Sequence, residues 1–232
     1  RRSNSEGKKG MIVKMEEEQN KNFLTKTFSW MFLGLLGTAI VAWYTYSSGL
    51  FLRIIFQGYY SMLLIVELLV VILFSFLFKK LSPTAVAILY FIYAMINGVS
   101  IAVIFALFEL NSVILLFVIS ALLFGGMALY GYRTQKDLSN WRTLLFGTLI
   151  AGLIISLINW FLGNPMIDII IDWVILFVFF GVTAYDMNML KMLQQTEGMD
   201  KSKLHIYGAM QLYLDFINIF LRVLSIFGKR RN

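Results

Sequence analysis

Residues 212–222 read LYLDFINIFLR, an apolar run that polar residues interrupt at helical spacing. Small or polar side chains recur every three or four positions along it and its flanks: Gly208, Gln211, Asp215, Asn218, Arg222 and Ser225. This spacing puts them on one stripe of an α-helix, while the remaining surface of the helix is apolar. A polar stripe that faced lipid would be prohibitively costly, so it must face protein or water. The sequence therefore predicts a last helix packed among other helices.

The composition of the whole chain indicates a membrane protein. Of the 232 residues, 59% are hydrophobic and 14% are charged, whereas an ordinary soluble domain has about 45–50% and about 25%. A water-soluble fold of this size could not hide so much apolar surface. The chain has no cysteine, which excludes disulfides, thiolate metal sites and cysteine nucleophiles. Its net charge of +7 resides in the tails and between apolar runs, a pattern that predicts membrane topology rather than nucleic-acid binding.

Seven segments are apolar and long enough to span a bilayer, which takes about 20 residues. They are Phe28–Tyr46, Ile54–Phe78, Thr84–Leu107, Ser112–Tyr132, Thr143–Leu162, Ile167–Leu190 and Leu204–Phe227. The predicted fold class is all-α: a polytopic membrane protein of seven transmembrane helices, with the seventh packed centrally among the other six. Residues 1–27 are expected to form a polar N-terminal tail that begins before the natural start at Met11 or Met15, residues 28–227 the transmembrane domain, and residues 228–232 a basic C-terminal tail.

The distribution of Lys and Arg between the segments predicts the orientation. Basic residues are frequent in the N-terminal tail and in alternate connections, which places the N-terminus in the cytoplasm. Seven spans then put the basic tail 228–232 outside, against this rule. Either the last helix does not cross fully or the short tail is translocated, and seven spans are the favoured interpretation.

Two aspartates within the apolar runs are the main candidate site. A charge at the bilayer centre costs several kcal/mol unless it is paired, neutralised or hydrated. Asp186 lies near the cytoplasmic end of the sixth segment, and the helix that carries Asp215 starts from the same side, so the two carboxyls could meet. Two carboxylates that share a site cannot both ionise cheaply, so the pair could hold one proton or a hard cation such as Ca²⁺. Alternatively, each aspartate only hydrogen-bonds a neighbouring helix.

Other polar residues have a functional and a structural interpretation. Glu67 lies in mid-helix, either on a cation pathway or as a protonated side chain bonded to a neighbouring helix. Lys79 and Lys80 end that helix as topological anchors, or one of them forms a salt bridge that latches the Asp pair. Arg222 lies roughly 10 Å along the axis from Asp215, so Asp215 needs another partner. Further candidates for an ion pathway or for supporting polar contacts are Tyr185, Gln211, Tyr213, Asn218 and Arg222.

The run 212–222 resembles the last-helix signature of the transmembrane Bax inhibitor motif (Bax inhibitor, UPF0005) family, and Tyr185-Asp186-Met187 resembles its Tyr-Asp motif in helix six. The region 98–100 and the second helix, ending at Lys79-Lys80, fit more loosely, and the resemblance covers roughly residues 28–227. It implies a seven-helix fold in which the other six helices wrap helix seven. In bacterial members the two aspartates form a pH-sensitive pair that controls a calcium leak, and these are Asp186 and Asp215 here. A basic residue that ends helix two latches the closed state, which is Lys79 or Lys80, and Glu67 matches an acidic position of helix two.

Three classes of function are therefore compared. The leading hypothesis is a pH-sensitive Ca²⁺ leak in the cytoplasmic (inner) membrane of a bacterium, with no enzymatic activity and no cofactor apart from the transported ion. The second is a membrane-embedded regulator that binds membrane proteases or cell-death proteins. The third is an intramembrane aspartyl protease, which is disfavoured because Tyr213-Leu214 precedes Asp215 where such enzymes have a Gly-x-Gly stretch. The expected partners are the lipid bilayer, Ca²⁺ and protons but no nucleic acid, and the chain could be a monomer.

Overall fold

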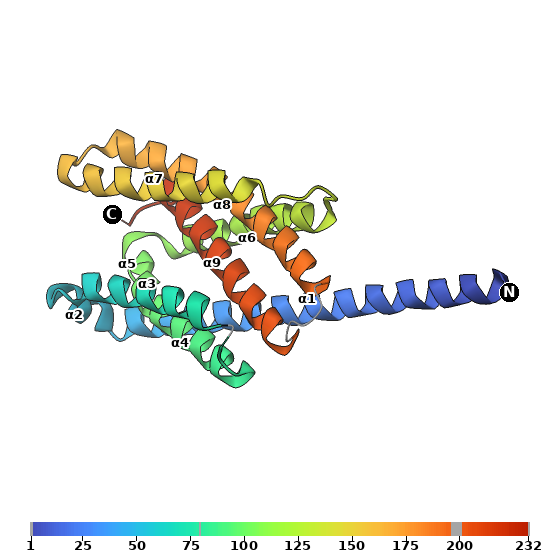
Figure 1. Cartoon of the computed structure of the whole chain (residues 1–232). Coiled ribbons are helices and arrows are strands. Elements are labelled where there is room, and N and C mark those ends of the chain that lie inside the picture. Colours follow the sequence, from blue (N-terminus) through green and yellow to red (C-terminus); the bar gives the residue numbers. More distant parts are fainter. Residues whose placement is uncertain (1, 79, 196–200, 232) are drawn as a thin grey trace.

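The computed structural model describes residues 2–78, 80–195 and 201–231, which form a bundle of helices (Figure 1). In chain order these residues form α1 (Arg2–Ser47), α2 (Leu50–Phe56), α3 (Tyr59–Leu77), α4 (Pro83–Ile101), α5 (Ile104–Leu107), α6 (Leu110–Arg133), α7 (Trp141–Leu162), α8 (Pro165–Gln195) and α9 (Lys201–Phe227). Seven stretches of these described residues are long and apolar enough to cross a membrane. The predicted all-α, seven-span class is thereby confirmed.

The helix boundaries differ from the predicted segments at three places. The second segment is split: α2 is followed by a turn at Gly58, whose φ of 73° favours glycine, and the spanning helix α3 starts at Tyr59. The third segment is interrupted between Ile101 and Ile104. Residues 2–27, expected as a polar tail, continue the first spanning helix, because α1 is helical from Arg2 and extends away from the bundle (Figure 1).

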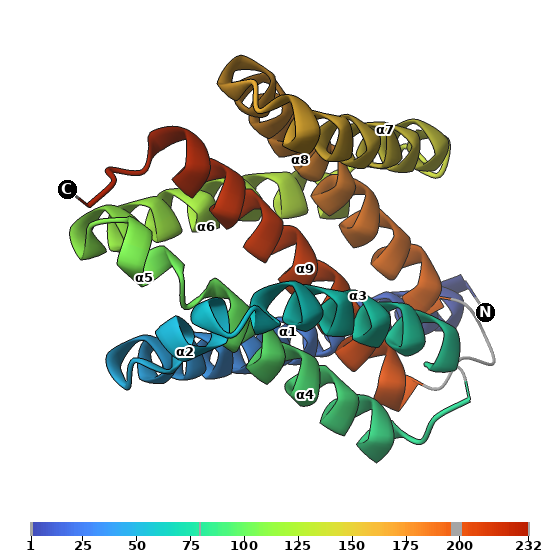
Figure 2. The same ribbon diagram turned by 90° about the vertical axis from the view of Figure 1, so that its left-hand side faces the viewer.

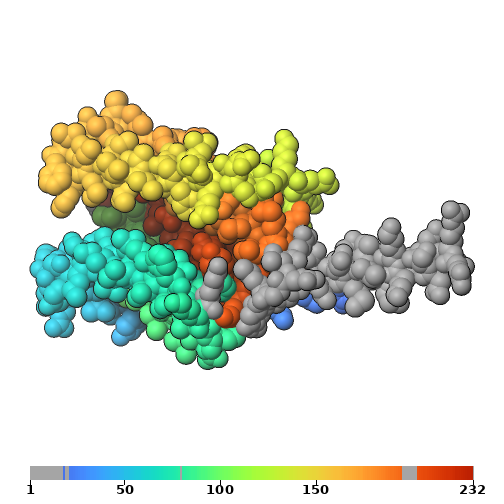
Figure 3. Space-filling view, viewed as in Figure 1, coloured from blue at the N-terminus to red at the C-terminus, as the bar shows by residue number. Residues whose placement is uncertain are grey.

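Helix α9 occupies the middle of the bundle. It packs against α1, α4, α6 and α8, and Figure 2 shows it between α1 and α4 on one side and α6 and α8 on the other. The outer helices are α3, which lies on α4, and α7, which lies on α8. In the space-filling view, α9 forms the floor of a recess between these two outer helices (Figure 3). Many of the largest fully buried side chains belong to α9, among them Met210, Leu212, Tyr213, Ile219 and Leu224.

The close approach of α6 to α8 depends on a glycine. A methyl group on Gly131 would lie 2.2 Å from the carbonyl oxygen of Ala184, a backbone atom that cannot move aside alone. We expect Gly131→Ala to destabilise the protein by about 1–2 kcal/mol, since overpacking forces backbone shifts. Thermal unfolding in detergent micelles measures this loss. Gly125→Ala on the same helix meets no atom within 4 Å, so an equal loss in both variants would contradict the steric explanation.

The basic C-terminal tail folds back onto the connection between α5 and α6. The Glu109 amide donates to the Lys229 carbonyl and the Arg231 amide donates to the Leu107 carbonyl, each at 2.9 Å. The Lys229 ammonium also lies 2.8 Å from a carboxylate oxygen of Glu109. The tail therefore lies at the end of the bundle where α6 begins, as seven crossings require, and part of its charge is neutralised there.

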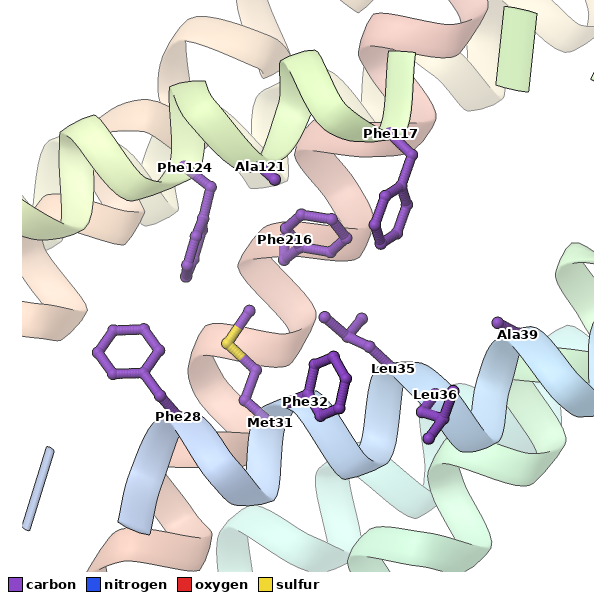
Figure 4. A pocket seen from close by; sticks show the side chains of 10 residues that line it. All are labelled: Phe28, Met31, Phe32, Leu35, Leu36, Ala39, Phe117, Ala121, Phe124 and Phe216. Atoms are coloured by element: carbon purple, nitrogen blue, oxygen red, sulfur yellow. The ribbon is translucent and has the colours of Figure 1, made fainter. Parts of the chain in front are cut away.

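An apolar groove opens beside α9, between α1 and α6. It has a volume of about 550 Å³ and is lined by Phe28, Met31, Phe32, Leu35, Leu36, Ala39, Phe117, Ala121, Phe124 and Phe216. Figure 4 shows the ring of Phe216 from α9 between the side chains of the two flanking helices. Because every lining residue is apolar, the groove suits hydrocarbon and is no path for a cation.

Candidate functional site

The two predicted aspartates lie on the packed helices α8 and α9. Asp186 is 3% exposed and Asp215 is 2% exposed, and they are close enough for the charge of one to act on the other. Both therefore sit where ionisation is costly unless a partner compensates. The Oδ2 atom of Asp215 is buried without a hydrogen-bond partner among the described residues. The site thus has an acceptor that is free to bind a proton, a water molecule or a cation.

Thr183 is a further member of this site that the sequence did not single out. It is fully buried one turn before Asp186, and its hydroxyl donates to the Phe179 carbonyl at 2.8 Å. The same hydroxyl lies close to the Asp215 carboxyl of α9. A hydroxyl has one proton and two lone pairs. The Thr183 hydroxyl can donate to only one acceptor at a time, so a bond from it to Asp215 would compete with its bond to the Phe179 carbonyl.

Within the described ranges, neither aspartate of the pair forms an ion pair. The two ion pairs found there are Arg222–Asp172 and Lys229–Glu109. Lys80, a predicted latch, is exposed, whereas the Asp pair is buried. Lys79, the other candidate latch, lies outside the described residues. The structure therefore does not bring Lys80 to the pair, and a latch by Lys79 stays a prediction.

The polar stripe of α9 has several partners. Arg222 and Ser225 both donate to the Asp172 carboxylate of α8. Arg222 is therefore paired with Asp172 and not with Asp215, in agreement with the separation of Arg222 and Asp215 along the helix. Asn218 is half-buried and donates to the Leu214 carbonyl of its own helix at 2.8 Å. Gln211 is half-buried as well. Asp172 thus makes a second polar contact between α8 and α9, separate from the Asp pair.

The Arg222–Asp172 contact can be tested by a double-mutant cycle. We expect Arg222→Gln to lower the free energy of unfolding by about 1 kcal/mol, because the pair is partly exposed, with side-chain exposures of 36% and 13%, and exposed pairs contribute little. Asp172→Asn in the Arg222→Gln background should cost little more. Thermal unfolding of the four proteins gives the coupling, and strictly additive losses would show that the pair contributes nothing.

Tyr213 lies on the side of α9 that faces α1 and α4, where it joins a chain of hydrogen bonds. Its hydroxyl lies 2.6 Å from the Thr38 hydroxyl of α1 and 3.0 Å from Asn97 Oδ1 of α4. The Asn97 amide lies 3.4 Å from Glu67 Oε1 of α3. Thr38 is also 2.9 Å from the Ala94 carbonyl. Glu67 therefore contacts a neighbouring helix, while its protonation and a role on a cation pathway both stay predictions, and Thr38 and Asn97 are members that sequence reasoning missed.

The end of α8 that carries Asp186 is held by the α6–α7 connection. Asn188, two residues after Asp186, accepts from the Leu138 amide at 3.2 Å and donates to the Lys136 carbonyl at 3.3 Å. Lys191 donates to the Tyr132 carbonyl at 3.1 Å. Tyr185 is buried, with its ring edge-on to Phe146 of α7. These contacts fix the backbone on which Asp186 is mounted.

The arrangement of carboxylates sets what ion chemistry is possible. No group of three or more His, Cys, Asp or Glu side chains with metal-site geometry occurs in the described part of the chain. Ca²⁺ takes six to eight oxygen ligands, so two carboxylates need added carbonyl, hydroxyl or water oxygens. The pair suits a transient cation contact rather than a tight storage site.

Comparison with known proteins gives matches over nearly the whole chain. The sequence profile of the family described as Inhibitor of apoptosis-promoting Bax1 matches residues 20–232. The inner membrane protein YbhL of Escherichia coli strain K12 is 38% identical over 217 residues, which cover 91% of this chain and 93% of that protein. Proteins of Deinococcus radiodurans and Borreliella burgdorferi are 35% and 34% identical, covering 92% and 96% of this chain and 93% and 100% of their own lengths.

Proposed function

Because this chain belongs to the Bax inhibitor family and is an integral inner-membrane protein, we propose that it is a pH-sensitive Ca²⁺ leak pathway gated by Asp186 and Asp215. The observation that carries the proposal is the burial of both carboxyls between α8 and α9, with no ion-pair partner in the described residues. The Lys/Arg pattern supports a cytoplasmic N-terminus as part of the same proposal.

The proposed gate works by a shift between closed and open helix arrangements. When the pair holds a proton, α8 and α9 pack together and the pathway is closed. When the proton leaves, two negative charges face each other in a buried site. Like charges about 4 Å apart repel by about 1 kcal/mol in water and about 4 kcal/mol near a protein surface. This repulsion favours separation of the helices or entry of a cation.

We propose no catalytic role for the pair. An aspartyl protease would have to admit a peptide and a water molecule to both carboxyls. Helix α9 is continuous through Tyr213, Leu214 and Asp215, so its backbone offers no opening there. The substrate of the proposed pathway is the ion itself, and no cofactor takes part.

Ion flux into liposomes tests the proposal. The purified protein is reconstituted into vesicles loaded with a fluorescent Ca²⁺ indicator, and influx is followed from pH 5 to pH 8. We expect influx above that of empty vesicles, rising with pH as the pair loses its proton. Asp168→Asn is the matched control: Asp168 lies in the first turn of α8 and accepts from Asn159 at 2.6 Å, a bond that asparagine preserves. Its influx should follow that of the unaltered protein.

A regulator of other membrane proteins is the second candidate, because the description of the family names an inhibitor of an apoptosis-promoting protein. Absence of influx at every pH, from protein whose helical content and unfolding temperature are intact, would overturn the leak proposal. The regulatory role would then lead, and the Asp pair would be a structural contact between α8 and α9.

A further inference from the structure

We propose that Glu67 is a second proton-binding site, whose proton completes a hydrogen-bond chain from α3 through α4 and α9 to α1. The chain has four contacts between five groups: Glu67 with Asn97, Asn97 with Tyr213, Tyr213 with Thr38, and Thr38 with the Ala94 carbonyl. The donor–acceptor distances, in that order, are 3.4, 3.0, 2.6 and 2.9 Å. Each contact needs one proton.

An ionised Glu67 leaves the chain one proton short. The Asn97 amide presents its N–H group to one neighbour and its oxygen to the other, while Tyr213 and Thr38 supply one proton each. These three protons must serve four contacts. If Asn97 donates to Glu67 and Tyr213 donates to Asn97, Thr38 must donate to Tyr213, and nothing is left for the Ala94 carbonyl. If Thr38 keeps its bond to Ala94, two oxygens elsewhere in the chain face each other without a proton.

A neutral Glu67 supplies the fourth proton. The carboxyl then donates to the Asn97 oxygen, the Asn97 amide turns to donate to Tyr213, Tyr213 donates to Thr38, and Thr38 donates to the Ala94 carbonyl. Exchange of the amide oxygen and nitrogen of Asn97 leaves the heavy-atom positions almost unchanged. Only when each group donates toward the Ala94 carbonyl, starting from Glu67, does every one of the four contacts have a proton. Because Asn97, Thr38 and Tyr213 are 5%, 2% and 0% exposed, water has little access to fill a missing bond.

The charges around Glu67 agree with a neutral carboxyl. The titratable groups that face it in the described residues are Tyr60 on its own helix, Tyr93 on α4 and Tyr213 on α9. The hydroxyl of Ser100 on α4, which donates to the Ile96 carbonyl at 3.5 Å, is a polar but uncharged neighbour of Glu67. The neighbouring helix α2 carries one charged residue, Arg53, which is exposed. The ion pairs of the described residues do not involve Glu67, so a negative charge there has no cation to compensate it.

This site differs in position and consequence from the Asp pair. Asp215 lies between α9 and α8, whereas Tyr213 ties α9 to α4 and α1. Loss of the Glu67 proton would loosen the contact that joins α1, α4 and α9 at Thr38 and Ala94. The stability of the bundle should therefore fall as pH rises through the ionisation of Glu67, whether or not the protein conducts Ca²⁺.

Infrared spectroscopy of the reconstituted full chain tests this proposal without any flux measurement. Protein labelled with ¹³C in the glutamate carboxyl groups separates the bands of glutamate from those of aspartate. Glu67 is the one glutamate within the seven membrane-spanning stretches of the described chain. The remaining glutamates lie outside those stretches: Glu6, Glu16, Glu17, Glu18, Glu109 and Glu197. We expect an isotope-shifted C=O band of a protonated carboxyl at pH 7.

The variants Glu67→Gln and Glu109→Gln assign the band. Glu67→Gln should remove it, and the glutamine amide can donate to Asn97 in place of the proton, so the unfolding temperature should become less dependent on pH. Glu109→Gln, in the α5–α6 connection, should keep it. Lack of an isotope-shifted band at pH 7 in the unaltered protein would overturn the proposal, and so would a band that survives Glu67→Gln. The first outcome needs no variant, so a variant that fails to fold does not leave the question open.

Discussion

Asp186→Asn and Asp215→Asn are each expected to flatten the pH dependence of Ca²⁺ influx between pH 5 and pH 8. Asparagine cannot ionise, so one neutral amide then faces one carboxyl and no like-charge repulsion arises at any pH. The influx of both variants should stay near the level of the unaltered protein at pH 5. A difference of 1.4 kcal/mol in an equilibrium is a factor of ten, and the repulsion expected for the pair is about 1–4 kcal/mol. At pH 8 the Ca²⁺ influx of the variants should therefore be lower than that of the unaltered protein by a factor of about ten or more.

The Asp168→Asn control separates a gate from a cation-binding site. If the carboxylates mainly attracted Ca²⁺, Asp168→Asn in the first turn of α8 would lower influx too, since Asp168 is another carboxylate that a passing cation could meet. If they form the gate, that control keeps the full rise with pH. The same indicator-loaded vesicles measure all the proteins side by side. Influx that rises with pH in Asp215→Asn as steeply as in the unaltered protein would disprove the paired gate.

The spans and the central helix could be predicted because both follow from local sequence properties. A bilayer requires every backbone group of a span to be bonded within the helix, so about 20 apolar residues identify one without knowledge of its neighbours. The polar stripe of α9 likewise indicates that this helix has protein around it. The break between α2 and α3 was missed because apolar residues continue on both sides of Gln57 and Gly58. The turn forms at Gly58, where the backbone takes a positive φ.

The candidate site was predicted in part, and the missed residues share a physical reason. Charged residues in apolar runs stand out, which is how Asp186, Asp215 and Glu67 were found. Thr38, Asn97 and Thr183 are uncharged, and their importance depends on which side chain a different helix brings to them. Asn97 had a signal that could have been used, since a lone amide within an apolar run needs a partner. The partner of Arg222 depends on the crossing of α8 and α9, which no local pattern specifies.

Tyr213→Phe is expected to destabilise the protein by about 2–3 kcal/mol, more than other losses of a single hydroxyl. The hydroxyl joins Thr38 and Asn97, so its removal leaves both without that partner inside the bundle. Single interhelical hydrogen bonds in membranes contribute about 0.6 kcal/mol on average and at most about 1.7 kcal/mol. Because water has no access to the two broken contacts, the loss should lie at the upper end of the range for two such hydrogen bonds. Chemical or thermal unfolding in micelles measures the loss.

Tyr90→Phe is the matched control for this substitution. Tyr90 is as fully buried as Tyr213, but its hydroxyl bonds no other side chain among the described residues and donates to the Trp30 carbonyl at 2.9 Å, so we expect a loss of about 1 kcal/mol. Combining Tyr213→Phe with Thr38→Val should cost less than the sum of the two single losses, because the second substitution removes a hydroxyl whose partner is already gone. Equal losses for the two tyrosines, together with additive losses for Tyr213 and Thr38, would mean that the chain from Glu67 to α1 is a set of independent contacts rather than a connected network.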